Sequence, residues 1–351
     1  MAEVNMSEKF SLTIVIPTYN RNHLLAETVA VLLPQLSADI DLVVLDNHSS
    51  TPVADTLTPY LREHVGGKFA SIVRNRQNIG GDANIVRCFE YASGDWIWVL
   101  ADDDMPSHDA VSLIKASVAK VPNLGLLNYF APCTTHPHRT KTTISQGISA
   151  YIENMDAFGA HLFLPASIYR ATVARKYLKV AHRNIHTLAA HVSIALCYMQ
   201  DGGIACQSSE IIVRFKEEYT ASVGWSRLAF GLGCSLLPDL LHEARDRRRL
   251  RKKIAEFLPF KTMYAESLII SKDRPVGRYG YFMYKEAINR IYLKSGDFKK
   301  FSLGSFLSIT LLFPNLSYDM ASCILRRIKG SPSGMSKMRA AEDMLSFYIE
   351  P

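Results

Sequence analysis

The chain has 351 residues, of which 48% are hydrophobic and 21% charged, and its formal net charge is +7. This length allows two domains, and the composition is that of an ordinary globular protein. The six cysteines are scattered without a CxxC pair, which favours free thiols in a reducing cytoplasm over disulfides or a zinc site. We find no signal-peptide pattern and no run of about 18 apolar residues, so we expect no membrane-spanning helix.

Strand and helix patterns alternate along the first 130 residues. Short apolar runs predict strands, and apolar residues at helical spacing between them predict helices. Such alternation predicts an α/β fold with a mostly parallel sheet and helices on both of its faces. The predicted strands are Leu12–Ile16, Ile40–Leu45, Ser71–Val73, Trp96–Leu100 and Leu124–Tyr129, and the predicted helices are 24–33, 84–92 and 111–118.

Polar residues follow four of the predicted strands. They occupy positions 18–21, 46–50, 75–78 and 102–104. In open α/β sheets, ligands bind outside the carboxyl ends of the strands. We therefore expect these four strand ends to converge on one pocket.

Three consecutive carboxylates, Asp102 to Asp104, end the apolar run that begins at Trp96. Adjacent negative charges repel one another unless a cation or hydrogen-bond donors compensate them, and oxygen ligands suit Mg²⁺ or Mn²⁺. The alternative is a helix N-terminus: Ser107 could cap a helix, and acids before it would interact favourably with the helix dipole. In either case we expect Met105 and Pro106 to start the next helix.

The second half of the chain changes character near residue 216. Residues 151–215 are less regular, with an apolar stretch at Leu162–Ile168 and a predicted helix at Ile185–Met199. Beyond Glu217 the pattern is almost wholly helical, without another good strand. We expect a flexible N-terminus at 1–9, an α/β domain at 10–215 and a helical region at 216–351.

The positive charge concentrates in the helical region. Apolar helical patterns at 228–241 and 301–313 flank the larger group, which favours an anionic membrane surface over nucleic acid as its partner. The alternative is a solvated helix face. The larger group comprises Arg245, Arg247, Arg248, Arg249, Arg251, Lys252 and Lys253, and the smaller one Arg326, Arg327 and Lys329.

Four motifs occur in a fixed order. They are IVIPTYNR at 14–21, LVVLDNHSS at 42–50, NIGG at 78–81 and GDWIWVLADDD at 94–104. Together they resemble the family 2 glycosyltransferases of the GT-A fold, and most closely the bacterial branch that builds surface polysaccharides. The resemblance is strong over about residues 10–130 and weakens toward 215. It implies that residues 10–215 form a GT-A catalytic domain that binds a nucleotide-diphosphate sugar.

The resemblance also implies roles for individual residues. Asp102 would contact the ribose, and Asp104, together with Asp102, would bind a divalent cation, Mn²⁺ or Mg²⁺, that bridges the diphosphate. The role of Asp103 is ambiguous, because the two acids of the family's motif align either with positions 102 and 104 or with positions 103 and 104. Asp46 could accept a hydrogen bond from a base N–H. The implied donor-binding residues are Pro17, Thr18, Tyr19, Asn20, Arg21, Asp46, Asn78, Gly80, Gly81, Asn84, Arg87, Asp102 and Asp103.

The catalytic base that inverting members of the family carry has no counterpart here. The corresponding segment, 182–191, reads HRNIHTLAAH and contains no acid. Histidine suits a general base, since its unperturbed pKa is about 6.5. We therefore take His186 first and His191 second as candidate catalytic residues, with Asp103 as a carboxylate candidate. Asp201 and the pair Glu217–Glu218 are rival acids.

The sequence thus predicts a metal-dependent glycosyltransferase that acts on a surface glycan with a lipid-linked acceptor. Its expected location is the bacterial cytoplasm, peripheral at the inner face of the cytoplasmic membrane. One alternative is a catalytically inactive scaffold of a polysaccharide assembly complex. Another is a nucleotidyltransferase, although such enzymes need a basic, Gly-rich loop after the first strand, which Pro17–Asn20 does not supply.

Overall fold

The computed structural model describes residues 10–65, 70–131, 139–215, 227–258, 285–294, 296 and 298–310. The predicted flexible segment 1–9, the acids Glu217–Glu218 and the basic group at 326–329 lie outside the described residues. Contacts within the chain define two compact units. Unit 1 comprises residues 1–185 and 190–216, and unit 2 comprises residues 186–189 and 217–351.

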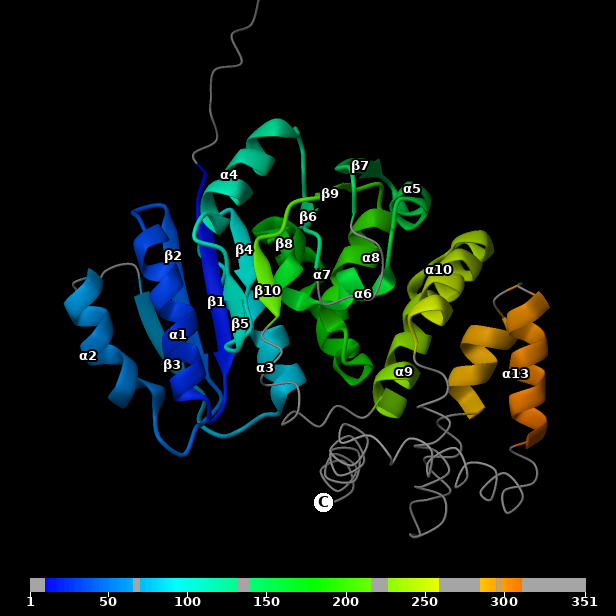
Figure 1. Ribbon diagram of the computed structural model, residues 1–351, viewed down its shortest axis with the longest axis horizontal. Coiled ribbons are helices and arrows are strands. Elements are labelled where there is room, and N and C mark those ends of the chain that lie inside the picture. The colour runs from blue at the N-terminus through cyan, green and yellow to red at the C-terminus, as the bar shows by residue number, and fades with distance from the viewer. Residues whose placement is uncertain are drawn as a thin grey trace, which may run out of the picture. The chain divides into compact units, whose positions relative to one another are not determined.

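Unit 1 is built on an eight-stranded sheet with the order β3-β2-β1-β4-β8-β6-β9-β7 (Figure 1). Neighbouring strands from β3 to β4 run parallel, and β8 and β7 run antiparallel to their neighbours. The predicted mostly parallel, helix-flanked sheet is confirmed. The strands are β1 (Leu12–Thr18), β2 (Ile40–Asp46), β3 (Ala70–Arg74), β4 (Trp96–Val99), β6 (Leu126–Asn128), β7 (Thr143–Gln146), β8 (Ser167–Arg170) and β9 (Ile204–Gln207).

Helices cover both faces of this sheet, which explains why its central strands are apolar throughout. Leu12, Ile14 and Ile16 of β1 belong to one core cluster with residues of α1, α2 and α4, whereas α3 contacts the strand from its other side. The helices of unit 1 are α1 (Asn22–Leu32), α2 (Val53–Val65), α3 (Gly81–Cys88), α4 (Ala110–Lys120), α5 (Ile148–Glu153), α6 (Phe158–Leu162), α7 (Ala171–Arg183) and α8 (Ala190–Gln200), with short 3₁₀ turns at Leu33–Gln35, Phe89–Tyr91, Leu164–Ala166 and Ile185–Thr187.

Strand β1 continues past Pro17 to Thr18, although the sequence predicts that it ends before the proline. The carbonyl oxygen of Val15 accepts a hydrogen bond from the N–H of Leu100, which follows β4. The carbonyl oxygen of Thr18 accepts one from the N–H of Asn47, which follows β2. Residues two apart in a strand point the same way, so the missing N–H of Pro17 faces the β4 side. The pairing with β4 ends at Val15, and no donor is required there.

The expectation that Met105 and Pro106 start a helix is wrong. They belong to β5 (Asp104–Pro106), which pairs antiparallel with β10 (Val213–Phe215) in a separate two-stranded sheet. Helix α4 begins only at Ala110, and its N-cap is Asp109 rather than Ser107. A strand pairing with a segment over 100 residues later leaves no local signal in the sequence.

The predicted helix at Ile185–Met199 is interrupted. Residues 185–187 form a 3₁₀ turn, Leu188 has a φ of +55°, and α8 starts at Ala190. A bulky residue in the left-handed region ends a regular helix. Because α7 ends at Arg183, His182 and His186 do not lie on one helix.

In unit 2 the described residues beyond 226 form helices and turns. No helix among the described residues is long and apolar enough to cross a membrane. The elements are α9 (Arg227–Leu236), a 3₁₀ turn at Leu237–Leu240, α10 (Ala244–Phe257), the π-helical turn η7 (Asn289–Leu293) and α13 (Phe298–Thr310).

Candidate functional site

The polar segments after β1, β2, β3 and β4 lie at one edge of the sheet. These four strands are consecutive neighbours and run parallel, so their carboxyl ends share that edge. Hydrogen bonds also connect the segments to one another, as described below for each pair of strand ends. The edge is therefore a continuous polar surface within unit 1.

The end of β1 holds the first two carboxylates of the acidic triplet. Thr18 Oγ1 donates to Asp102 Oδ2 at 2.6 Å. Arg21 Nη1 donates to Asp102 Oδ1 at 3.2 Å and to Asp103 Oδ2 at 2.8 Å. One guanidinium group thus compensates two of the three adjacent negative charges.

Asp104 is buried, and its Oδ1 has no hydrogen-bond partner among the described residues. Burial raises the pKa of Asp104 to about 8, and the negative charges of Asp103 and Asp102 contribute to that rise. Burial likewise raises the pKa of Asp102 to about 6, against the lowering effect of Arg21 and Thr18. An orphaned, buried carboxylate oxygen is costly unless something compensates it.

The backbone of the triplet is held from two sides. Thr28 in α1 donates its hydroxyl hydrogen to the carbonyl oxygens of Asp102 and Asp104, at 3.0 and 3.1 Å. On the other side, Asp104 pairs with Phe215 of β10. These contacts fix the direction of the carboxylates, and neither partner is apparent from the motif itself.

Asp46, the last residue of β2, is buried and already accepts three hydrogen bonds. Its Oδ1 accepts from the Ser49 N–H at 2.8 Å, and its Oδ2 accepts from Arg74 Nη1 at 2.8 Å and from the Val53 N–H at 3.3 Å. A carboxylate has about four acceptor positions. A nucleoside base that bonds to Asp46 would have to share one of these oxygens.

The loops that follow β1 and β2 are linked by Asn20. Its backbone N–H donates to Ser49 Oγ at 2.9 Å, and its Oδ1 accepts from the N–H and the hydroxyl of Ser50, each at 2.8 Å. Asn20 and His48 both have a positive φ, +57° and +67°. The side chains of Tyr19 and His48 are exposed at this edge.

Four asparagines form an amide network behind the same edge. Asn75 donates to Asn47 Oδ1 at 2.9 Å and to Asn84 Oδ1 at 2.8 Å, and Asn47 donates to Asn78 Oδ1 at 2.8 Å. Arg87 Nη1 donates to Asn75 Oδ1. Predicted donor residues from α3 and its preceding loop are thus brought together. The sequence marks Asn47 and Asn75 only as polar strand ends, because their partners lie in other loops.

Gly80 is the N-cap of α3 and has a φ of +86° with a ψ of 154°, a region that is essentially restricted to glycine. Its N–H donates to Asn78 Oδ1 at 2.8 Å. A Cβ added at Gly80 or at Gly81 would meet no atom within 4 Å. The two glycines therefore leave open space in front of the first turn of α3.

The two candidate histidines lie in different units. His191 is buried in α8 of unit 1, and its ring nitrogen Nε2 bonds to the carbonyl of His161 at 3.3 Å. Burial lowers the pKa of His191 to about 4. His186 is exposed and belongs to unit 2. The third histidine of the segment, His182, pairs with Glu90 at 3.2 Å.

Over the part of the chain that the structure describes, no group of three or more His, Cys, Asp or Glu side chains is placed to hold a metal ion. The triplet nevertheless contains the buried Oδ1 of Asp104, which has no hydrogen-bond partner among the described residues. Mg²⁺ is usually held by one or two carboxylates together with waters and substrate phosphates. The residues present fit that kind of site.

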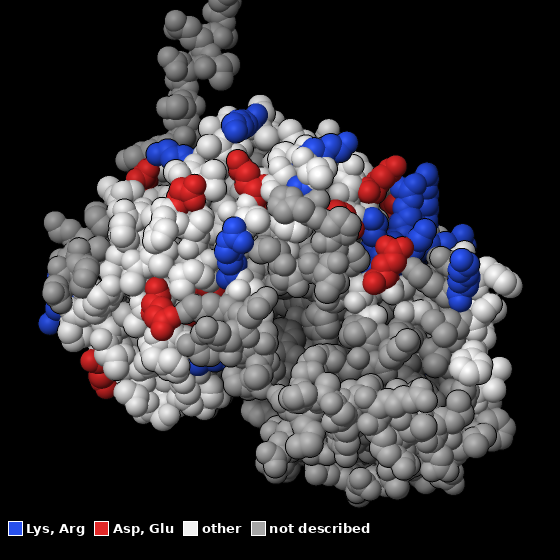
Figure 2. Space-filling model, in the orientation of Figure 1, with Lys and Arg blue, Asp and Glu red and all other residues white. Residues whose placement is uncertain are grey.

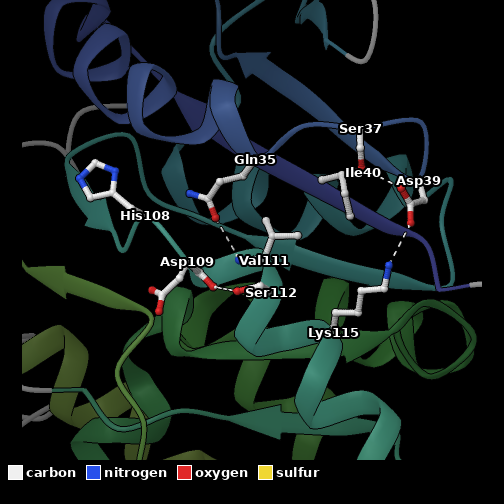
Figure 3. A pocket seen from close by; sticks show the side chains of 9 residues that line it. All are labelled: Gln35, Ser37, Asp39, Ile40, His108, Asp109, Val111, Ser112 and Lys115. Carbon is white, nitrogen blue, oxygen red and sulfur yellow. Dashed lines mark hydrogen bonds and ion pairs between the residues drawn. The ribbon is translucent and has the colours of Figure 1, made fainter.

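A cavity of about 220 Å³ lies away from this edge (Figure 3). Ile40, the first residue of β2, lines it, whereas the site residue Asp46 is the last residue of that strand. Its polar lining is already paired: Asp39 accepts from Ser37, and Gln35 accepts from Val111. We assign it no part in the candidate site.

Comparison with known proteins agrees with this geometry. Residues 13–163 match the family model for glycosyl transferase family 2. No curated protein sequence matches the chain.

Solved structures share the fold at low sequence identity. TarS from S. aureus, in a crystal structure with UDP-GlcNAc, is 14% identical with a TM-score of 0.60, over 96% of this chain and 92% of that one. The mannosyltransferase PcManGT from Pyrobaculum calidifontis, in complex with GDP-Man and Mn²⁺, is 11% identical with a TM-score of 0.52, over 98% of this chain and 89% of that one. The expected GT-A fold is confirmed. Residues 13–163 of this chain are thus similar to glycosyl transferase family 2 domains.

Proposed function

We propose that the chain is a metal-dependent glycosyltransferase that moves a sugar from a nucleotide-diphosphate sugar to a hydroxyl group of a bacterial surface glycan carried on a lipid. The observation that carries this proposal is the acidic triplet at the carboxyl edge of the sheet. Thr18 and Arg21 hold Asp102 there, and Asp104 keeps one buried oxygen without a partner among the described residues. The complexes of TarS with UDP-GlcNAc and of PcManGT with GDP-Man and Mn²⁺ support it.

In this proposal the loop after β1 and the end of β2 bind the nucleoside. Tyr19 is exposed beside Asn20, which ties its loop to the loop after β2, so the two loops offer one preorganised surface. Asp102 would accept a hydrogen bond from the ribose. The amide network positions Asn78 and Gly80, where the open space before α3 admits the diphosphate.

Asp104, with Asp102, would hold a divalent cation. When bound, this cation supplies a Lewis acid that neutralises the charge developing on the departing diphosphate. Asp104 must be ionised to bind it, and the raised pKa of Asp104 then predicts weaker cation binding at acidic pH. Arg21 forms ion pairs with Asp102 and Asp103 and keeps both in place without the cation.

His186 remains the first candidate for the general base that activates the acceptor hydroxyl. It is exposed, whereas His191 is buried and its lowered pKa makes it a weak base. Asp103 remains the carboxylate candidate. The acceptor would be lipid-linked, and residues 245–253 would face an anionic membrane surface at the inner side of the cytoplasmic membrane.

Transfer from nucleotide-sugars in the presence of Mn²⁺, measured for the wild type and Asp104→Ala, tests the proposal. We expect at least about a hundredfold loss for Asp104→Ala, because electrostatic stabilisation of the leaving group is lost. Asp109→Ala, an exposed acid at the N-terminus of α4, serves as the matched control and should retain activity. Equal turnover of the wild type and Asp104→Ala would refute the metal site. No turnover of the wild type with any donor would favour the inactive scaffold.

A further inference from the structure

Helix α13 in unit 2 exposes large apolar side chains. The exposed fractions are 82% for Phe298, 48% for Phe301, 57% for Phe306 and 56% for Ile309. At 3.6 residues per turn, these four positions fall within about 140° of the helix circumference. They share this face with Ser302 and Ser305, and we call it the aromatic face of α13. Three exposed phenylalanines on one helix face are unusual for a surface that contacts only water.

The opposite side of α13 already packs within unit 2. A Cβ added at Gly304 would lie 2.9 Å from Tyr292 Cβ and 3.1 Å from Leu293 Cδ2, so the helix contacts η7 closely at this residue. Gly304 is itself buried. Among the described residues, the packing that holds α13 therefore uses the side away from the aromatic face.

The basic helix α10 packs against the same element. Tyr292 of η7 donates its hydroxyl hydrogen to the Ala255 carbonyl of α10 at 3.3 Å. Arg248 of α10 also lies close to Gly296, two residues before α13, since its Cδ lies 3.7 Å from a Cβ placed there. Arg245, Arg248 and Lys252 are exposed, and Figure 2 shows Lys and Arg side chains gathered over α10. The cationic helix and the aromatic face thus belong to one packed assembly.

We infer that the aromatic face of α13 inserts into the interfacial region of an anionic lipid bilayer while the cationic side chains of α10 contact the lipid headgroups. An amphipathic helix with aromatic residues on one side binds in this way, and neighbouring basic residues add attraction to anionic lipid. The inference rests on the proposed function in that a lipid-linked acceptor brings the enzyme to a membrane. It adds an apolar anchor to the charge of residues 245–253.

Two other occupants fit the chemistry less well. Nucleic acid would use the positive charge, but an aromatic helix face gives no contact with a phosphate backbone. A second copy of this chain would cover the aromatic face but carries the same positive charge, so it offers no partner for the cationic side chains of α10. Lipid is the partner that satisfies both features at once.

Flotation of the full-length protein with phosphatidylglycerol/phosphatidylcholine vesicles tests the inference. We expect the wild type to bind at low salt and to retain part of its binding at about 1 M salt, where the Debye length is only about 3 Å. Phe298→Ser with Phe301→Ser should weaken the salt-resistant binding about tenfold or more, since each buried aromatic side chain contributes strongly to partitioning. Arg245→Gln with Arg248→Gln should reduce only the binding at low salt.

A matched pair of single variants distinguishes an effect of the aromatic face from an effect of removing any exposed apolar side chain. Ile309→Ser lies on the aromatic face, whereas Ile144→Ser changes an equally exposed isoleucine in β7 of unit 1. We expect Ile309→Ser to weaken binding and Ile144→Ser to leave it unchanged. Equal effects of the two variants would overturn the inference.

Three further results would also overturn it. The first is that the wild type does not float with the vesicles. The second is that the double variant Phe298→Ser with Phe301→Ser floats like the wild type. The third is that the wild type is a dimer, that this double variant is a monomer, and that neither binds vesicles. Donor hydrolysis in detergent-free solution, measured in parallel, keeps the two proposals apart. Failed vesicle binding with intact hydrolysis rejects only the membrane anchor, and the converse rejects only the proposed activity.

Discussion

At the scale of single residues, the site combines a compensated and an uncompensated carboxylate. Asp102 accepts hydrogen bonds from Thr18 and Arg21, whereas the Oδ1 of the buried Asp104 has no partner among the described residues. Buried polar atoms of folded proteins are usually hydrogen-bonded. This difference between Asp102 and Asp104 is the reason why we propose the cation site at Asp104.

This difference leads to a prediction for the pH dependence of stability. Burial raises the pKa of Asp104 to about 8, above its value of about 4 in the unfolded chain. The folded state therefore binds the proton more tightly, and this contribution to stability is complete below about pH 4 and is lost as the pH rises through about 8.

Asp104→Asn should remove that dependence. Between about pH 5 and pH 8, in EDTA, we expect the free energy of unfolding of the wild type to fall by at least about 1.4 kcal/mol more than that of the variant, which corresponds to one pKa unit. Urea unfolding at both pH values measures it. Asp109→Asn is the control and should follow the wild type. Parallel pH curves for the wild type and Asp104→Asn would show that Asp104 is ionised normally.

The grouping of the candidate site residues was predictable where a motif is local, and hydrogen-bond partners were missed where they are distant in the sequence. The segments 17–21 and 102–104 are contiguous, and the structure joins them through Thr18 and Arg21. The sequence predicted only that Thr28 lies in a helix. It did not reveal the hydrogen bonds of Thr28 to the triplet, because the accepting backbone carbonyls are 74 and 76 residues away. The asparagine network likewise depends on loops that only the fold brings together.

At the scale of elements, buried strands gave the strongest sequence signal. All four residues of β4 are buried, so an unbroken apolar run marked the strand. Helix α2 was missed, although Val53, Leu57 and Leu61 recur every four residues and are buried, because Pro59 lies inside the helix. The short strand β5 could not be found, since its partner β10 follows more than 100 residues later.

The turn into α3 gives a prediction at this scale. Gly80→Ala should destabilise the protein by about 1–3 kcal/mol, because the backbone of Gly80 lies in a region that alanine adopts only with strain. Gly81→Ala is the matched control, since neither position has a neighbour within 4 Å of an added Cβ and only Gly80 has a positive φ. We expect less than about 0.5 kcal/mol there. Urea unfolding distinguishes the two, and equal losses would contradict the backbone argument.

At the scale of the whole molecule, the sequence predicted a GT-A α/β domain followed by a helical region. The GT-A fold could be predicted because each polar motif follows one of four strands that are neighbours in a mostly parallel sheet. The packing of α13 could not, because the apolar pattern of residues 301–313 does not say which side faces the core. The close approach of Gly304 to Tyr292 shows which side of α13 packs within unit 2.

The central claim is that the carboxyl edge of unit 1 binds a nucleotide-diphosphate sugar with the help of a cation at Asp104. Thermal unfolding of the wild type and Asp104→Asn against a panel of nucleotide-sugars, with and without Mn²⁺, tests it most directly. For one donor at about 100 times its Kd, binding adds about 2.7 kcal/mol, and we expect a rise in Tm of about 5 °C or more for the wild type. The Mn²⁺-dependent part of that rise should vanish in Asp104→Asn. No shift with any donor, or the same Mn²⁺-dependent shift in both proteins, would contradict the account.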